Sequence, residues 1–158
     1  MVVSVEIRRV QHKPGLLDKL KRVFTGPKNV KVGFPAGESS ASNIQKAIWN
    51  HFGTAGGASG GGWGGPIPER PFLANAMRDN RGKYRDGMQT AARAILRGDY
   101  DNRQALQRLG ILAQGDVQSE ITALSSPPNS PVTIALKGSS NPLIDSGEMR
   151  AAVTWKVE

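Results

Sequence analysis

Alternating apolar and polar residues predict short strands in two parts of the chain. The alternation is clearest in residues 3–7 and 30–34, where every second side chain is valine, isoleucine or phenylalanine. A two-residue period of this kind is typical of a strand that buries one face. We also expect a third strand at residues 131–136, followed by a tight turn at 137–140, and a last strand at the C-terminus.

Apolar residues three and four positions apart predict two short helices between the first strands. The first covers residues 14–24, with Pro14 near its start. The second is capped by a serine between positions 39 and 42 and ends at Gly53. Their expected inward faces are Leu16, Leu17, Leu20, Val23 and Phe24 in the first, and Ile44, Ala47, Ile48 and Phe52 in the second.

Two longer helices are predicted in the middle of the sequence. The first covers residues 72–96, and the second follows a break at Gly98 and is capped by Asp99 or Asp101. Their apolar stripes are Leu73, Met77, Tyr84, Met88, Ala91, Ala92 and Ile95, and then Leu106, Leu109, Ala113, Val117, Ile121 and Leu124. Two helices joined by a short turn favour a helical hairpin packed on one face of a small sheet.

We therefore expect residues 1–158 to form a single domain of the α+β class. In it, a small, mostly antiparallel sheet packs against the pair of longer helices. Apolar residues make up 38% of the chain, with 19 glycines and 10 prolines. This composition predicts a modest core and long Gly/Pro-rich loops.

The segment 53–65 is the richest in glycine, with eight of its thirteen residues, and Trp63 is its only large side chain. Such a segment has high backbone entropy and cannot build a core of its own. Two interpretations stay open: a flexible surface loop, or a loop that orders against a neighbouring subunit with Trp63 as its anchor. The prolines of residues 66–72 then predict an extended chain.

The composition excludes several kinds of chemistry. Without cysteine there are no disulfides, thiol nucleophiles or cysteine-ligated zinc, and two histidines are too few for a histidine-rich metal site. No apolar run reaches the roughly 20 residues that span a bilayer. The N-terminal alternation differs from the apolar core of a signal peptide. We expect no cofactor and no membrane contact, and a location in the cytoplasm or in a particle assembled there.

Three polar motifs resemble catalytic groups only superficially. Ser146 has no nucleophile-elbow motif around it, and both histidines lie more than ninety positions upstream. The DSGE motif at residues 145–148 instead predicts a helix capped by Asp145 or Ser146, with Glu148 completing a capping box. The Lys-Gly-Ser-Ser sequence at 137–140 lacks the glycine spacing of a phosphate loop. His51 lies at a predicted helix end, where we expect it to pack against neighbouring side chains or to cap the helix.

The net charge of +8 and the pI of about 10.2 indicate a basic surface. On helices, basic residues usually form a solvated face. If several copies of the chain formed a ring, these residues would instead line its lumen and contact DNA phosphates without reading bases. Alternatively, they would pair with acidic groups on an adjacent ring. No sequence-reading DNA- or RNA-binding motif is present. The candidates for a lumen position are Arg78, Arg81, Lys83 and Arg85.

The C-terminal sequence 127–157 resembles the signature of a family of tailed-phage virion proteins, known as neck, head–tail joining or tail-completion proteins. Its pattern is Pro-Asn-Ser-Pro-x-Thr from Pro128, then Lys-Gly at 137, then Pro-Leu-Ile-Asp-Ser-Gly from Pro142. A short helix and an aromatic-containing strand follow.

An earlier pair of motifs resembles a second signature of the same family. NHFGT occupies residues 50–54, and IPERPFL occupies residues 67–73. His51 stands where the family usually has glutamate, and a long glycine insertion separates the two motifs. From residue 50 to residue 157, the region that contains these segments spans about two-thirds of the chain, and the segments follow in the same order as in the family.

The resemblance implies an α+β fold, no enzymatic activity, and a homo-oligomeric ring, a hexamer or dodecamer, between capsid and tail of the virion. The implied partners are other copies of the chain, adjacent connector or head-completion proteins, and tail terminator or tail tube proteins. Genomic DNA would pass nearby without specific binding, and assembly would take place in the bacterial cytoplasm. The alternatives are a tail terminator that caps the tail tube and a basic DNA-binding accessory protein. Expected contact residues are Phe52, Trp63, Ile67, Pro68, Arg70, Pro71, Phe72, Asn129, Pro131, Lys137, Leu143, Ile144 and Asp145.

Overall fold

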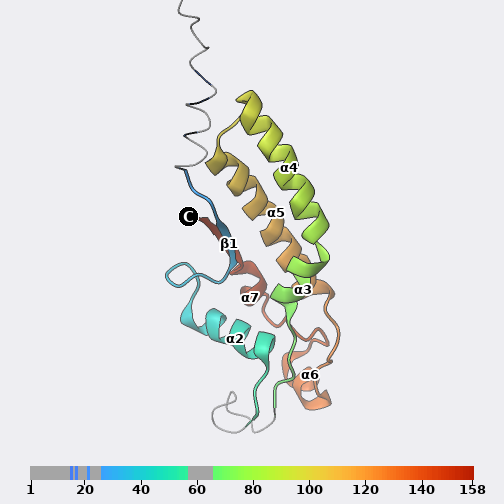
Figure 1. The fold of residues 1–158 in the computed structure, drawn as a ribbon. Coiled ribbons are helices and arrows are strands. Elements are labelled where there is room, and N and C mark those ends of the chain that lie inside the picture. Colours follow the sequence, from blue (N-terminus) through green and yellow to red (C-terminus); the bar gives the residue numbers. More distant parts are fainter. Residues whose placement is uncertain (1–14, 16, 18–20, 22–25, 57–65) are drawn as a thin grey trace, which may run out of the picture.

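The computed structural model describes residues 15, 17, 21, 26–56 and 66–158 (Figure 1). Its elements are, in chain order, β1 (Val30–Gly33), α2 (Ala41–Phe52), α3 (Phe72–Asp79), α4 (Arg81–Arg97), α5 (Asn102–Ala123), α6 (Pro131–Lys137), α7 (Glu148–Ala151) and β2 (Thr154–Val157). The described part is mostly helical with a two-stranded antiparallel sheet. The expected α+β character is confirmed at this coarse level. No helix in these ranges is long and apolar enough to cross a membrane.

The sheet joins β1, near the start of the described residues, to β2 at the C-terminus. Val32 lies opposite Trp155, and Val30 lies opposite Val157. Both strands were predicted from the sequence, and both are confirmed. A two-stranded sheet is only marginally stable by itself. It therefore depends on the helix that packs against it.

Helix α5 is the central element of the fold and contacts α3, α4, α7 and both strands (Figure 1). Gln114 Nε2 donates a hydrogen bond to Val153 O at 2.7 Å, which fixes the helix beside the entry to β2. At Gly110, a Cβ atom would lie only 2.6 Å from Cδ2 of Trp155. The missing side chain therefore lets the indole lie directly against the helix backbone.

The sequence prediction for α5 is confirmed at its start and along its buried face. Asp101 Oδ1 accepts a hydrogen bond from Gln104 N at 2.8 Å, and Gln104 Oε1 accepts one from Asp101 N at 3.0 Å. These two bonds form a capping box. The buried stripe residues are Leu106, Ala113, Val117, Ile121 and Leu124.

Replacing Asp101 with alanine should lower the free energy of unfolding by about 1 kcal/mol, because the first turn of α5 loses its cap. Asp99→Ala is the matched control, since Asp99 only forms an exposed ion pair with Arg97 at 2.9 Å. Urea unfolding of both variants measures the difference. Equal losses would contradict the capping role of Asp101.

The predicted helix at 72–96 is divided into α3 and α4, so the prediction of one continuous helix is wrong. Asn80, between them, has φ −97° and ψ 9°, and its Nδ2 donates to Ala76 O at 3.0 Å. Asparagine side chains compete in this way with the helical hydrogen bonds of the backbone. The predicted inward face is confirmed at Ala91, which is buried, but it is wrong at Met88 and Ala92, which are exposed, Met88 at 44%.

Residues 131–136 are helical, so the prediction of a strand there is wrong. Ser130 Oγ accepts a hydrogen bond from Thr133 N at 3.2 Å, and Pro131 lies in the first turn of α6. Gly138 ends the helix with φ 67°. A capping serine, a first-turn proline and a left-handed glycine are strong helix-end signals. They outweigh an alternation of only a few residues.

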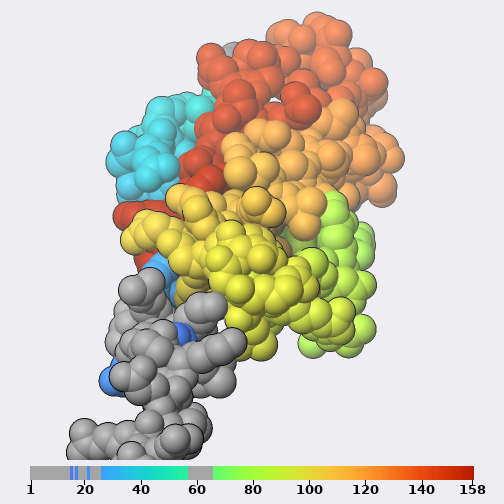
Figure 2. Space-filling view, turned by 90° about the horizontal axis from the view of Figure 1, so that it is seen from above, coloured from blue at the N-terminus to red at the C-terminus, as the bar shows by residue number. Residues whose placement is uncertain are grey.

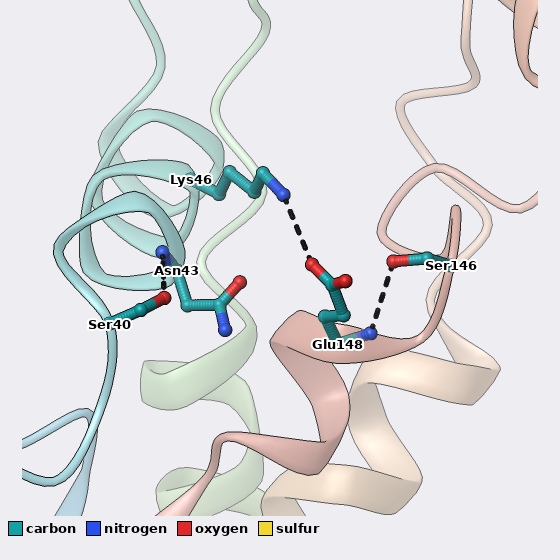
Figure 3. Close-up of polar contacts among 5 residues, drawn as sticks. All are labelled: Ser40, Asn43, Lys46, Ser146 and Glu148. Atoms are coloured by element: carbon teal, nitrogen blue, oxygen red, sulfur yellow. Dashed lines mark hydrogen bonds and ion pairs between the residues drawn. The ribbon is translucent and has the colours of Figure 1, made fainter.

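Helix α2 begins and ends where the sequence predicted. Ser40 Oγ accepts a hydrogen bond from Asn43 N at 3.2 Å (Figure 3), and Gly53 follows the last helical residue. Of the predicted inward face, Ala47 is buried. Ile48 and Phe52 were also predicted to face inward, and this prediction is wrong, because they are 50% and 70% exposed.

The core lies where α3, α5 and the C-terminal segment meet. Its fully buried side chains are Phe72, Val117, Ile121 and Val153. The ring of Phe34 packs edge-on against Phe72, with centroids 6.2 Å apart. The strand predicted at 3–7 lies outside the described residues, as does most of the helix predicted at 14–24.

Candidate functional site

Arg70 is the centre of a polar cluster that joins the C-terminal motif of residues 127–157 to the earlier pair of motifs at residues 50–54 and 67–73. Its side chain is only 3% exposed. Nε donates a hydrogen bond to Pro127 O at 2.8 Å, and Nη2 donates to Pro128 O at 3.2 Å and to Asn129 Oδ1 at 3.3 Å. Nη1 donates to Asn50 Oδ1 at 3.3 Å. One guanidinium thus holds together three segments of the chain.

The backbone around Arg70 places the side chain between α2 and α3. Arg70 N donates to Asn50 O at 2.8 Å, in the last turn of α2. Two residues later, Phe72 begins α3 and is fully buried. Because Phe72 is anchored in the core, the guanidinium of Arg70 is directed toward the segment that precedes α6.

Asn141 organises the other side of the cluster. Its backbone oxygen accepts hydrogen bonds from Lys137 Nζ at 2.9 Å and Asn129 Nδ2 at 3.2 Å. Its side-chain Oδ1 accepts from Leu143 N at 2.9 Å and Ile144 N at 3.0 Å. The turn after α6 is therefore closed by one asparagine. Sequence reasoning missed Asn141, although an asparagine directly before a proline is a known turn signal.

The electrostatics of the cluster are those of a buried cation held by neutral acceptors. Burial lowers the pKa of the Arg70 guanidinium below its usual value. Burial also lowers the pKa of Lys137; Asp145 opposes this shift, and the positive charge of Arg70 adds to it. Buried charges require hydrogen-bond partners. The carbonyl and amide oxygens around Arg70 supply them, which indicates a structural role.

A small cavity of about 100 Å³ lies beside the cluster, and its lining includes Lys137, Asp145 and Ser146. Ser146 Oγ accepts a weak hydrogen bond from Glu148 N at 3.4 Å (Figure 3). Glu148 also forms an exposed ion pair with Lys46 of α2 at 3.6 Å. These polar groups connect the start of α7 to α2.

The predicted cap of the DSGE motif is wrong in its details. The N-cap of α7 is Gly147, with φ 82°, which has no side chain that could cap the helix. The capping box predicted from Asp145 or Ser146 to Glu148 is therefore absent. Glycine reaches this left-handed conformation without strain, which is why a glycine stands here.

The other predicted contact residues differ in exposure. Phe72 and Leu143 are buried in the chain's own core. Ile67, Pro71, Asn129, Lys137 and Ile144 are partly exposed, and Phe52, Pro68, Pro131 and Asp145 are exposed. Trp63 lies outside the described residues, so neither interpretation of the glycine-rich loop is tested.

Hydrogen bonds join the segment before residues 57–65 to the segment after them. Thr54 N donates to Ile67 O at 2.9 Å, and Ile67 N donates to Thr54 Oγ1 at 3.1 Å. At Gly53, with φ 71°, a Cβ atom would lie 2.8 Å from Ile67 O. A glycine is therefore required for this close approach of residues 50–54 and 67–73.

The four candidate lumen residues do not share one environment. Lys83 Nζ lies 2.6 Å from Asp116 Oδ1 of α5, so its charge is paired within the chain. Arg78 Nη2 donates to Asn75 Oδ1 at 3.1 Å and is exposed, as are Arg81 and Arg85. The three arginines match the solvated helix face predicted as one interpretation.

His51 packs against aromatic rings, as one interpretation of the sequence predicted. Its ring centroid lies 4.6 Å from that of Phe52 and 5.4 Å from that of Phe72, both edge-on. Burial lowers the pKa of His51, and the charge of Glu69 partly opposes the shift. The imidazole therefore belongs to the packing between α2 and α3.

Comparison of this chain with family models, curated proteins and solved structures finds no match.

Proposed function

We propose that this protein is a structural virion protein of a tailed-phage neck. In this proposal it forms a homo-oligomeric ring, a hexamer or dodecamer, that joins or completes the tail at the head–tail connector. It acts without a cofactor and catalyses no reaction. Its partners are other copies of itself, the adjacent connector or head-completion protein, and the tail terminator or tail tube protein.

The observation that supports this proposal is the meeting of the C-terminal motif and the earlier pair of motifs at Arg70. The residues that Arg70 contacts in the C-terminal motif are 57 to 59 positions away in the sequence. Because residues of the separate motifs contact each other, the motifs form one structural unit. This supports the resemblance from which the function is proposed.

The chemistry of the cluster also fits an assembly role better than a reaction. The groups around Arg70 are carbonyl and amide oxygens, which hold segments in place and transfer no protons at neutral pH. Ser146 is engaged with the start of α7. A rigid cluster of this kind can present neighbouring surface segments in a fixed geometry.

The test is genetic and structural. In the phage that encodes this chain, loss of the gene should give DNA-filled heads and separate tails. Electron microscopy of complemented particles should place a ring of this protein at the neck. Expression of Arg78→Met should restore joined particles, whereas Arg70→Met should not. Normal joined particles in the absence of the protein would refute the proposal.

A DNA-binding accessory protein is the second candidate, favoured by the exposed Arg78, Arg81 and Arg85 on α3 and α4. The same experiment separates the alternatives. An accessory protein would be absent from purified virions. A tail terminator would leave tails of abnormal length when it is missing.

A further inference from the structure

Helix α6 displays apolar side chains that the described residues of the chain leave exposed. No residue of this helix is buried. Val132 and Leu136, one helical turn apart, are 69% and 78% exposed, and Ala135 beside them is also exposed. We call these three residues the α6 face. Packing within the described part of the chain does not account for a leucine and a valine at these positions, because it removes neither from water.

The α6 helix is nevertheless held firmly at both ends. Ser130 caps its start, and the carbonyl groups of Pro127 and Pro128 just before it are bound by Arg70. Lys137 Nζ, at its end, donates to Asn141 O. The chain thus fixes the orientation of a short helix whose apolar face points to solvent, as a preformed contact surface would require.

A second apolar face lies on α2. Ile48 and Phe52, also one helical turn apart, are exposed, and Ala41 and Gln45 continue the same side of the helix. We call these four residues the α2 face. Like the α6 face, it carries no charged side chain, although the chain as a whole has a net charge of +8.

The two helices that carry these faces lie on opposite flanks of the molecule. In Figure 1, α2 and α6 lie on either side of the end of the molecule that is remote from the tip of the α4–α5 hairpin. In Figure 2, α2 and residues 131–137 again lie on opposite sides, with the C-terminal segment between them. A subunit of a closed ring needs two different patches on opposite flanks, because each contact joins unlike surfaces.

We propose that the α6 face of one copy packs on the α2 face of the next copy, and that this contact builds the ring. The proposal deepens the proposed neck function and rests on it. Each face carries an apolar pair at positions i and i+4, so the two helices can pack ridge into groove. Since neither face is charged, two basic copies can approach here without opposing like charges.

The absence of cysteine from the chain allows a direct test of this contact. Copies with Ile48→Cys and an affinity tag are mixed with untagged copies carrying Leu136→Cys, and the mixture is oxidised. The expected product is a disulfide-linked pair of one tagged and one untagged copy. A chain with both substitutions should give a ladder of linked copies that ends at the closed ring.

Two substitutions to aspartate test the energetic role of the contact. Leu136→Asp should weaken self-association by about 30-fold or more, as expected for the centre of an interface. Ile111→Asp is the matched control: Ile111 is 59% exposed, but on α5, outside both faces. The Ile111→Asp variant should self-associate as strongly as the wild type. Sedimentation velocity measures association, and circular dichroism melting verifies that both variants fold.

Several results would overturn the proposed contact. Disulfides between two Leu136→Cys copies in place of mixed pairs would show a symmetric contact between α6 helices. A wild-type chain that stays monomeric at its highest soluble concentration would exclude self-association through these faces. A protected Ile48→Cys thiol in such a monomer would show that the chain's own residues cover α2.

The failure of the contact and the failure of the neck function are distinguishable in virions. If particles that carry both cysteine substitutions contain the protein at the neck but form no disulfide between positions 48 and 136, the contact is wrong and the function stands. If the protein is absent from virions yet forms the mixed disulfide when purified, the contact stands and the neck function is wrong.

Discussion

Replacing Arg70 with methionine should lower the free energy of unfolding by roughly 3 kcal/mol, the scale expected when a buried charged donor is removed from several acceptors. Methionine fills a similar volume but donates no hydrogen bond. The carbonyl groups of Pro127 and Pro128 and the side-chain oxygens of Asn50 and Asn129 all lose a donor. Urea unfolding, followed by far-ultraviolet circular dichroism, measures the loss.

Two further variants show that the geometry of the guanidinium is what matters. Arg78→Met is the control for loss of charge, since Arg78 is exposed, and it should change stability by less than about 0.5 kcal/mol. Arg70→Lys keeps the charge but lacks the planar set of donors, so its free energy of unfolding should fall by most of the amount expected for Arg70→Met. An Arg70→Met protein as stable as Arg78→Met would refute the structural role of the cluster.

Replacing Gly110 with alanine should destabilise the protein by about 1–3 kcal/mol, because it inserts a methyl group into a packed contact. The new Cβ atom would lie 2.6 Å from Cδ2 and 2.8 Å from Cγ of Trp155. Either the indole or α5 must move, and both β1 and β2 pack on this helix. The near-ultraviolet circular dichroism of Trp155 should change together with the stability.

Gly115 offers a matched control in the same helix. Beyond the adjoining residues of its own helix, no described atom lies within 4 Å of a Cβ placed there, and the residue is exposed. Gly115→Ala should therefore stabilise the protein by about 0.5–1 kcal/mol, through helix propensity alone. The two glycine substitutions are expected to have opposite signs. A stabilising Gly110→Ala would contradict the observed approach of the indole to the helix.

The ends of helices could be predicted from the sequence where a polar side chain and a glycine bracket an apolar pattern. Ser40 and Gly53 bound α2, and Asp101 starts α5, as predicted. These signals work because a cap is satisfied by amides only two or three residues away. The same local reasoning failed at Asn80, where a side chain that contacts the preceding turn interrupts an otherwise continuous helical pattern.

The candidate site could be predicted only in part. The motifs contained Arg70, Asn129 and Lys137, but nothing in their spacing placed Arg70 next to Asn129. That contact depends on the path of the chain through α3, α4 and α5, which returns Pro127 to the end of α2. Asn141 was missed because its role lies in contacts with residues on both sides of the turn.

The sequence by itself determined the strands at both ends of the described chain, the start and end of α2, and the start and buried stripe of α5. These features follow from the period of apolar residues and from caps, which involve neighbouring positions. Only the tertiary structure decided that Arg70 is buried while Phe52 is exposed. Burial depends on what packs opposite a side chain, and the partner that covers Arg70 is the segment before α6, far away in the sequence.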